Sequence, residues 1–180
     1  ALGSLISTNG FSQDLINSLQ IKSGFIIEIF AENIDTPRQI AESDAGNIFV
    51  GSRNAGTISV IDKNKKIRII ASGLSNSTGV TYFNGDLYFS EVDKIWKIPN
   101  IDEALLSSEE YPKKVLVTDN LPSDKWHGWK WIDFGPDNKL YVPVGAPCNI
   151  CNPSKESKYG FDDRYASIMR LNGCLLYTSD

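Results

Sequence analysis

The sequence predicts an all-β fold that is built by repeating one antiparallel unit. Three stretches share the same pattern, in which a strand, a tight turn and a second strand are followed by a connection and a third strand. Their turns, at residues 44–46, 84–86 and 135–138, consist largely of glycine, asparagine, aspartate and proline, which favour turn conformations. Repetition of one supersecondary unit indicates a repeat architecture, so we expect three equivalent sheets.

The spacing of the repeats indicates which repeat fold this is. The residues that follow the turns, Ile48, Leu87 and Leu140, are separated by 39 and 53 residues, and one blade of a β-propeller takes roughly 40 to 50. The longer interval indicates an insertion at residues 100–111, where the composition predicts a short helix. Propellers have typically about four to eight blades, so three cannot close a ring. We therefore expect an N-terminal fragment of about three blades, with further sequence downstream.

Three segments are expected along the chain. Residues 1–24 form an N-terminal segment, which is either the remnant of an export signal or the point at which a longer sequence was cut. Apolar residues at helical spacing predict a short helix at 11–20. Residues 25–173 form the partial propeller. Residues 174–180, CLLYTSD, match one reading frame of a common transposon-end sequencing adapter and are interpreted as an artefact, with a native strand as the alternative.

Composition and charge exclude several classes of function. The chain has 180 residues, of which 41% are hydrophobic, as is ordinary for a globular domain. Its 18 basic and 22 acidic residues are spread without long runs and give a net charge of −4. Neither a nucleic-acid-binding stripe nor a polybasic membrane patch is therefore expected. No stretch approaches the roughly 20 apolar residues of a membrane-spanning helix, so no transmembrane segment is expected.

Cys148 and Cys151 form a close pair that leaves three interpretations open, namely a local disulfide, a redox motif or half of a zinc site. Haem attachment is excluded, because Asn152 rather than histidine follows the second cysteine. A structural zinc site needs two further cysteine or histidine ligands, and His127 is the only one left once the terminal Cys174 is discounted. A catalytic zinc site made of the two cysteines, His127 and a water stays open. A disulfide is the usual state in an exported protein, and we favour it.

Several segments, in the same order, resemble one known family. They are FIIEIFAENIDTPRQIA, GNIFVGSRNAGTISVI, GDLYFSEVDKIWKI, LPSDKWHGWK and FGPDNKLYVPVGAPCNIC, and the combination of HGWK with GAPCNIC is the most specific. From Phe25 to Leu171 the chain is similar to the soluble quinoprotein glucose/sorbosone dehydrogenases, and among them to the sorbosone dehydrogenase branch. The resemblance implies a six-bladed propeller that oxidises a sugar or polyol hydroxyl with pyrroloquinoline quinone (PQQ), held by calcium in the central channel.

The same resemblance implies an electron acceptor as partner, a periplasmic or secreted location, and calcium ligands beyond the end of this sequence. It also assigns a role to His127, the only histidine of the chain. Members of the family have their catalytic base at the start of the strand that precedes the GPD turn, and His127 has that position. An imidazole, with a reference pKa near 6.5, suits removal of the hydroxyl proton during hydride transfer. The alternative is a structural histidine, hydrogen-bonded at the end of a blade.

Aromatic and cationic residues surround this histidine in the sequence. Trp126, Trp129 and Trp131 are three of the four tryptophans, and aromatic neighbours suit a planar cofactor or a sugar ring. The alternative is packing between blades. Strand alternation is expected to send Trp129 and Trp131 to one face and Lys130 to the other. By the resemblance, Trp129, Lys130 and Arg53 are candidates for cofactor binding, the two cations through the carboxylates of PQQ, with solvated surface charges as the alternative.

One position departs from the better-known glucose dehydrogenases. Where those enzymes resemble one another in having Gly-Asp after the equivalent strand, this chain has Gly145-Ala146. The aspartate supports the catalytic histidine, and an orienting partner fixes the tautomer of an imidazole. His127 is therefore expected either to lack an orienting partner or to take another, with Asp124 as the candidate.

Two other classes of function remain open at this point. A calcium-dependent lactonase or esterase on a six-bladed propeller would use carboxylates and asparagines in the channel and would not need a histidine base. A noncatalytic propeller that binds carbohydrate or protein would keep the scaffold and tolerate loss of His127.

Overall fold

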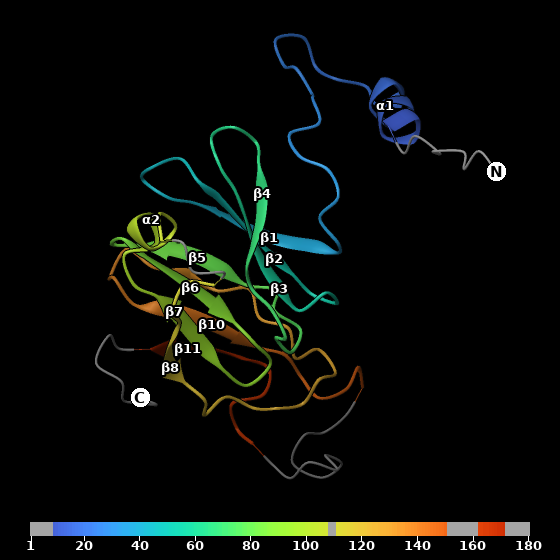
Figure 1. Ribbon diagram of the computed structural model, residues 1–180. Helices are drawn as coiled ribbons and strands as arrows, with labels where there is room; N and C mark the ends of the chain where they lie inside the picture. Colours follow the sequence, from blue (N-terminus) through green and yellow to red (C-terminus); the bar gives the residue numbers. More distant parts are fainter. Residues whose placement is uncertain (1–8, 108–110, 151–161, 172–180) are drawn as a thin grey trace, which may run out of the picture. The chain divides into compact units, whose positions relative to one another are not determined.

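The computed structural model describes residues 9–107, 111–150 and 162–171. The chain divides into two units, Ala1–Asn33 and Ile34–Asp180. In the first unit, helix α1 (Asn9–Ser18) overlaps the segment that was predicted to be helical (Figure 1). The described residues that follow it in this unit form neither helix nor strand. Within the described part of the chain, no helix has both the length and the apolar character that crossing a membrane requires.

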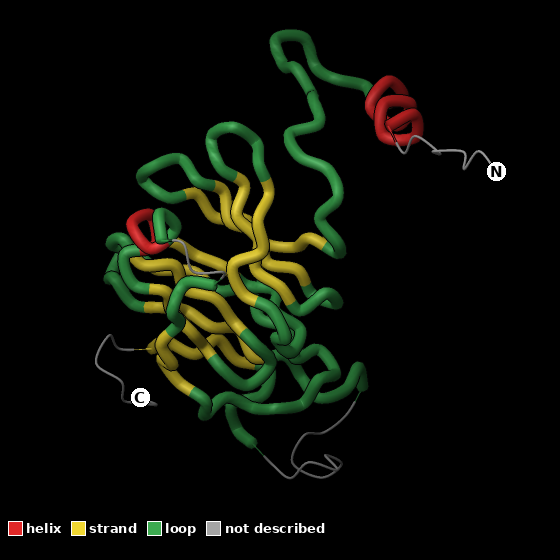
Figure 2. The backbone as a smooth tube through the Cα atoms, in the orientation of Figure 1, coloured by secondary structure: helices red, strands yellow, loops and turns green. Residues whose placement is uncertain are grey.

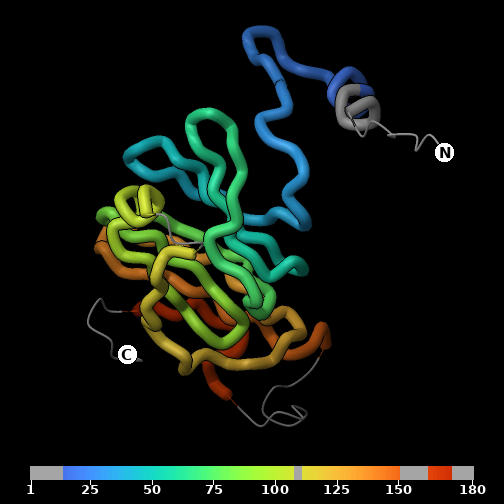
Figure 3. The backbone as a smooth tube through the Cα atoms, in the orientation of Figure 1, coloured from blue at the N-terminus to red at the C-terminus, as the bar shows by residue number. Residues whose placement is uncertain are grey.

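The described residues of the second unit form three antiparallel sheets, and in each sheet the strands pair in sequence order. The first sheet contains β1 (Pro37–Glu42), β2 (Ile48–Ser52), β3 (Thr57–Ile61) and β4 (Ile67–Ala71). The second contains β5 (Val80–Phe83), β6 (Asp86–Ser90), β7 (Ile95–Ile98) and β8 (Val115–Thr118). The third contains β9 (Asp133–Phe134), β10 (Leu140–Val144) and β11 (Ser167–Leu171). Figure 2 shows the strands in yellow, and Figure 3 shows the chain passing from one sheet to the next.

The predicted turns join the first two strands of each sheet. Gly46, with φ +77°, lies in the turn between β1 and β2. Asn84 and Gly85 have φ values of +49° and +87° and form the two-residue connection between β5 and β6, a geometry that needs positive φ at both positions. Asn138, with φ +59°, lies between β9 and β10. All three turns are therefore confirmed, and each uses a residue type that tolerates the left-handed region.

Consecutive sheets pack face to face. Phe49 and Phe89, both 0% exposed, belong to one buried cluster between the first and second sheets. Ile132 and Val142 belong to a second cluster, between the second and third sheets. The innermost strands β1, β5 and β9 contact one another in succession. Sheets that follow one another around a shared inner edge are the blades of a β-propeller, so the predicted all-β fold class is confirmed.

Side chains of the innermost strands tie the three blades together. Gln39 of β1 is 5% exposed and makes two hydrogen bonds with the backbone of Ile132. Its Nε2 donates to the carbonyl oxygen at 2.8 Å, and its Oε1 accepts from the amide at 3.2 Å. On β5, the hydroxyl of Thr81 donates to Asp133 Oδ1 at 2.8 Å. The segment that leads into β9 is thus fixed by both preceding blades.

Two details of the strands differ from the prediction. The first two sheets each have a fourth, outer strand, β4 or β8, that the three-strand pattern did not include. In the third blade, the strand that was expected to begin at His127 begins only at Asp133. His127 has a positive φ of +53°, which an extended strand does not allow, and the side chain of Gln39 takes both backbone groups of Ile132.

The predicted insertion contains helix α2 (Ile101–Ala104), which lies between β7 and β8 in the sequence. Its Asp102 accepts hydrogen bonds from the Ser43 hydroxyl at 2.7 Å and from Asn47 Nδ2 at 2.8 Å. The insertion of the second blade is therefore attached to the first turn of the first blade.

Candidate functional site

A tight turn places His127 and Trp126 just before the third blade. The amide of Gly128 donates to the carbonyl of Lys125 at 3.2 Å, so that Trp126 and His127 are the two central residues. Asp124 Oδ1 accepts from the amide of Trp126 at 3.0 Å. A Cβ on Gly128 would overlap the carbonyl oxygen of Asp124, which explains the glycine here. His127 adopts φ +53°, and left-handed conformations of residues other than glycine are frequently associated with functional sites.

The imidazole of His127 is oriented by a backbone carbonyl. Its Nδ1 lies 3.1 Å from the carbonyl oxygen of Ala146, in the segment that follows β10. A carbonyl oxygen can only accept, so Nδ1 carries the hydrogen and, in the neutral ring, Nε2 keeps a free lone pair. Gly145 packs directly on the histidine, because a Cβ at that position would overlap His127 O and lie 2.8 Å from His127 Cβ.

Four side chains form a continuous series at this site, which we call the aromatic ladder: Trp126, His127, Trp129 and Arg53. The ring of His127 lies 5.4 Å from that of Trp126 at an angle of 46°, and 5.8 Å from that of Trp129 at 82°. The guanidinium carbon of Arg53 lies 3.8 Å from the centroid of the Trp129 ring. Arg53 comes from the connection between β2 and β3 of the first blade, so the fold brings the first and third blades together here.

Arg53 carries a donor that the described residues do not satisfy. Its Nε is buried and has no hydrogen-bond partner within the described part of the chain. A buried donor without a partner costs free energy, typically about 1–3 kcal/mol, and such groups are uncommon in folded proteins. The guanidinium is stacked on the face of Trp129. Guanidinium groups can bind carboxylates through pairs of hydrogen bonds.

Lys130 lies outside the ladder. It is 1% exposed, and its Nζ donates to the carbonyl of Gly128 at 3.0 Å. Its own carbonyl accepts from the Ser90 hydroxyl at 3.0 Å, and a Cβ on Gly79 would overlap that carbonyl. Burial alternates as predicted, with Lys130 buried and its neighbour Trp131 56% exposed. Burial also lowers the pKa of Lys130 from its ordinary value of 10.5 to about 8, while the nearby charge of Asp93 acts in the opposite direction.

Replacing Lys130 by methionine should stabilise the full-length protein at pH 7, by about 1–4 kcal/mol, because it removes a buried charge that has no carboxylate in contact. The gain should shrink as the pH rises from about 8 to about 10.5. In that range the unfolded wild type binds more protons at this lysine than the folded wild type, so the free energy of unfolding of the wild type increases with pH. Denaturant unfolding at a series of pH values, with both proteins compared, measures the difference.

The matched control is Lys97→Met. The Lys97 ammonium pairs with Asp86 at 2.7 Å, and this hydrogen bond raises its pKa above the ordinary value. Its contribution should therefore stay nearly constant from pH 8 up to the ordinary pKa of lysine, because both the folded and the unfolded protein keep this proton there. A Lys130→Met difference that also stays constant would show that burial does not lower the pKa of Lys130.

The remaining predicted residues have the following places. Cys148 is disulfide-bonded, whereas Cys151, its proposed partner, lies outside the described residues, as does Cys174. Asp124 does not have the predicted role, because the partner of His127 Nδ1 is a carbonyl oxygen and Asp124 Oδ1 accepts from the turn amide instead. In the part of the chain that is described, no group of three or more His, Cys, Asp or Glu residues is arranged to hold a metal ion.

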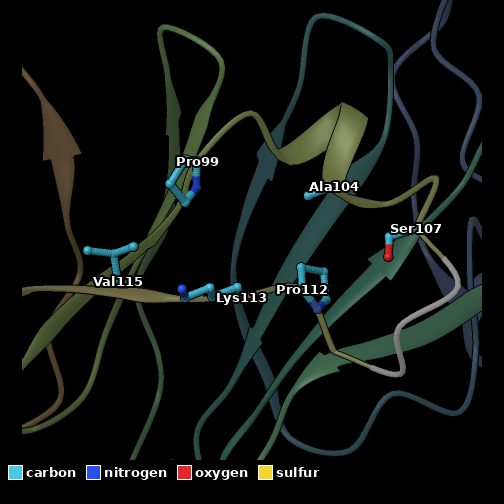
Figure 4. A pocket seen from close by; sticks show the side chains of 6 residues that line it. All are labelled: Pro99, Ala104, Ser107, Pro112, Lys113 and Val115. Atoms are coloured by element: carbon cyan, nitrogen blue, oxygen red, sulfur yellow. The ribbon is translucent and has the colours of Figure 1, made fainter.

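A cavity of about 380 Å³ lies between α2 and β8, on the second blade (Figure 4). None of the predicted site residues contributes to it, and Lys113 is its one ionisable side chain. Its lining consists of Pro99, Ala104, Ser107, Pro112, Lys113 and Val115. The candidate site is therefore at the ladder, which holds the predicted site residues His127, Trp129 and Arg53, and not at this cavity.

The chain is similar to an uncharacterized protein of Borreliella burgdorferi, with 33% identity over 153 residues. The match covers 81% of this chain and 40% of that protein, so the chain spans less than half the length of this curated relative. No protein-family profile matches the chain.

Solved structures with the same fold include three β-propeller proteins. The PQQ-bound aldose sugar dehydrogenase of Streptomyces coelicolor is 19% identical, with a TM-score of 0.55 over 83% of this chain and 48% of that chain. The PQQ domain of pyranose dehydrogenase from Coprinopsis cinerea is 17% identical, with a TM-score of 0.54 over 68% and 31%. A calcium structure of a carbohydrate-active enzyme of family AA12 from Trichoderma reesei is 16% identical, with a TM-score of 0.60 over 82% and 38%. At these identities the likeness establishes the fold.

Proposed function

We propose that the protein is a PQQ-dependent dehydrogenase that oxidises a hydroxyl group of a sugar or polyol, of the glucose/sorbosone dehydrogenase type. The observation that carries the proposal is the state of His127, whose Nδ1–H donates to the Ala146 carbonyl at 3.1 Å and whose Nε2 is thereby left as a base. A histidine held in this tautomer, beside a stacked tryptophan and arginine, is suited to take a proton next to a planar anionic cofactor.

The ladder offers a cation and an aromatic ring, which suit a flat anionic cofactor such as PQQ. PQQ is a flat molecule with three carboxylates, and it supplies a quinone that accepts a hydride from the alcohol carbon. Arg53 offers a guanidinium whose buried Nε needs an acceptor, and Trp129 holds that guanidinium from one side at 3.8 Å. Lys130 was also predicted to bind the cofactor, but its ammonium is already bonded to the Gly128 carbonyl and buried. We therefore assign cofactor binding to Arg53 and Trp129 and leave Lys130 in a supporting role beneath the His127 turn.

In the oxidation, His127 takes the hydroxyl proton on Nε2. The C–H bond of the alcohol breaks as the hydride leaves, the O–H bond breaks as the proton moves to Nε2, and a C=O bond forms in the product. The Ala146 carbonyl keeps the ring oriented before the transfer and accepts a hydrogen bond from the same Nδ1–H after it. No described cluster of carboxylates offers a calcium site, and we propose that calcium is held by residues other than those described.

We further propose that the protein works in the periplasm or outside the cell, together with a separate electron acceptor. The disulfide at Cys148 supports this proposal, because disulfides persist in oxidising compartments and are rare in the cytosol of most organisms.

A spectroscopic experiment tests the reaction. The full-length protein is reconstituted with PQQ and calcium, and aldoses, sorbosone and polyols are added in turn while the absorption of the bound quinone is followed. At least one of these compounds should reduce the bound PQQ, so that the absorption of the quinone falls after the compound is added. A preparation treated with a chelator, without added calcium, serves as the control. If PQQ is bound, as shown by dialysis, and none of these compounds reduces it, the proposed function is wrong.

A further inference from the structure

Trp126 is the exposed end of the aromatic ladder. Its side chain is 58% exposed, whereas Trp129 is partly covered by Arg53. Single exposed apolar residues are common on protein surfaces and by themselves indicate nothing. Here the indole also lies beside the imidazole of His127, with ring centroids 5.4 Å apart. Trp129, proposed to bind the cofactor, also contacts the imidazole, at 5.8 Å, but it is stacked with Arg53, so Trp126 is the aromatic neighbour of His127 that is open to a substrate.

The backbone at Trp126 is held by hydrogen bonds in the absence of a ligand. Its amide donates to Asp124 Oδ1, and the following turn is closed by the Gly128 amide. The backbone of His127 is in turn packed against Gly145. A ligand that stacks on the indole therefore does not have to order this part of the backbone. Binding then loses less conformational entropy.

The angle between the two rings determines what kind of ligand fits. At 46°, the indole and the imidazole form a corner with an apolar wall and a polar wall. The ring form of a sugar has an apolar C–H face and a rim of hydroxyl groups. With that face on the indole, the rim is directed toward the imidazole, whose remaining nitrogen is the acceptor. An open-chain polyol has no rigid face and gains less from such a wall.

We propose that Trp126 is the substrate platform of this site and that it selects sugars in their ring form, aldopyranoses, over open-chain polyols. The inference rests on the proposed function, since it takes His127 as the group next to the reacting hydroxyl. Trp126 acts by contact with the substrate ring and takes no proton.

The test compares Trp126→Ala, Trp126→Phe and Trp131→Ala in the full-length protein with PQQ and calcium. Trp131 is the matched control, because it is 56% exposed and only five residues further along the chain. For glucose, Trp126→Ala should raise KM by about 10- to 30-fold, as expected for loss of roughly 1.4–2 kcal/mol of stacking, with kcat within about threefold. Trp126→Phe should recover most of the loss, and Trp131→Ala should match the wild type. KM for sorbitol should change by less than about threefold in every variant.

A second measurement separates this inference from the proposed function. Calorimetric titration of glucose into the same proteins without PQQ reports binding alone. Weaker binding of glucose by Trp126→Ala supports the platform even if the protein never reduces PQQ, in which case the proposed function fails by itself. Equal binding of glucose by Trp126→Ala and wild type overturns the platform and leaves the dehydrogenase in place. An equal loss for glucose and sorbitol overturns the selection of ring forms.

Discussion

Replacing His127 by alanine should slow reduction of bound PQQ in the full-length protein by about 10²- to 10⁴-fold, the range expected for loss of a positioned base. The reason is that the imidazole of His127, whose Nδ1 is bonded to the Ala146 carbonyl, keeps a lone pair on Nε2 for the hydroxyl proton. Stopped-flow absorbance after mixing with a saturating sugar measures the reduction step. Affinity for PQQ should change by less than about threefold, because Arg53 and Trp129 remain.

His127→Asn is the matched control for the backbone. The residue has φ +53°, and asparagine adopts this region more readily than most residues. The asparagine amide can still donate a hydrogen bond but cannot act as a base. The asparagine variant should therefore be about as stable as the wild type and as slow as the alanine variant. If instead PQQ affinity is lost while the reduction step keeps its rate, His127 is a binding residue and the proposed proton transfer is wrong.

Gly145→Ala should lower the rate of PQQ reduction by about 10²-fold and destabilise the protein by about 1–3 kcal/mol. The new methyl group would overlap the carbonyl oxygen of His127 and lie 2.8 Å from His127 Cβ, so one of the two segments must move. Movement of either segment changes the hydrogen bond between His127 Nδ1 and Ala146 O. The rate is measured by stopped flow, and the stability by denaturant unfolding.

Ala146→Gly is the neighbouring control, because it keeps the carbonyl that orients His127 and removes only a methyl group. It should leave the rate within about threefold of the wild type and lower stability by no more than about 1 kcal/mol. A Gly145→Ala protein with wild-type rate and stability would mean that the segment after β10 can move away from the histidine, and the orienting role of Ala146 would then be wrong.

The orienting partner of His127 could not be predicted from side-chain types, because it is a backbone group. The sequence has Gly145-Ala146 where the glucose dehydrogenases that it resembles have Gly-Asp, and this difference predicted a histidine without its partner or one bonded to Asp124. In the structure the backbone carbonyl of Ala146 fills the role at 3.1 Å. Every residue has a backbone carbonyl, so the residue type at position 146 does not predict this hydrogen bond. The glycine at position 145 was the available signal, since it permits the close approach.

The propeller fold could be predicted from local sequence signals, namely turn residues and the apolar strands on either side of them. Positive φ at Asn84 and Gly85 follows from their residue types, and the apolar strands on either side need no distant partner to be recognised. Three such units at blade-like intervals implied a propeller, and the sheets confirm it. The outer strands β4 and β8 were missed, although both pair antiparallel with the strand before them, each with one register shift.

The candidate site depends on contacts between distant parts of the chain. Arg53 and Trp129 are 76 residues apart, and neither residue type reveals that they stack at 3.8 Å. Lys130 has the same formal charge as Arg53, but packing of the second and third blades buries it and lowers its pKa, whereas Arg53 lies on a connection between strands. Burial and stacking are properties of the packed blades, because they depend on which surfaces meet. For this reason both Arg53 and Lys130 could be named from the sequence as candidates for cofactor binding. Only the packing of the blades distinguished the two, by burying Lys130.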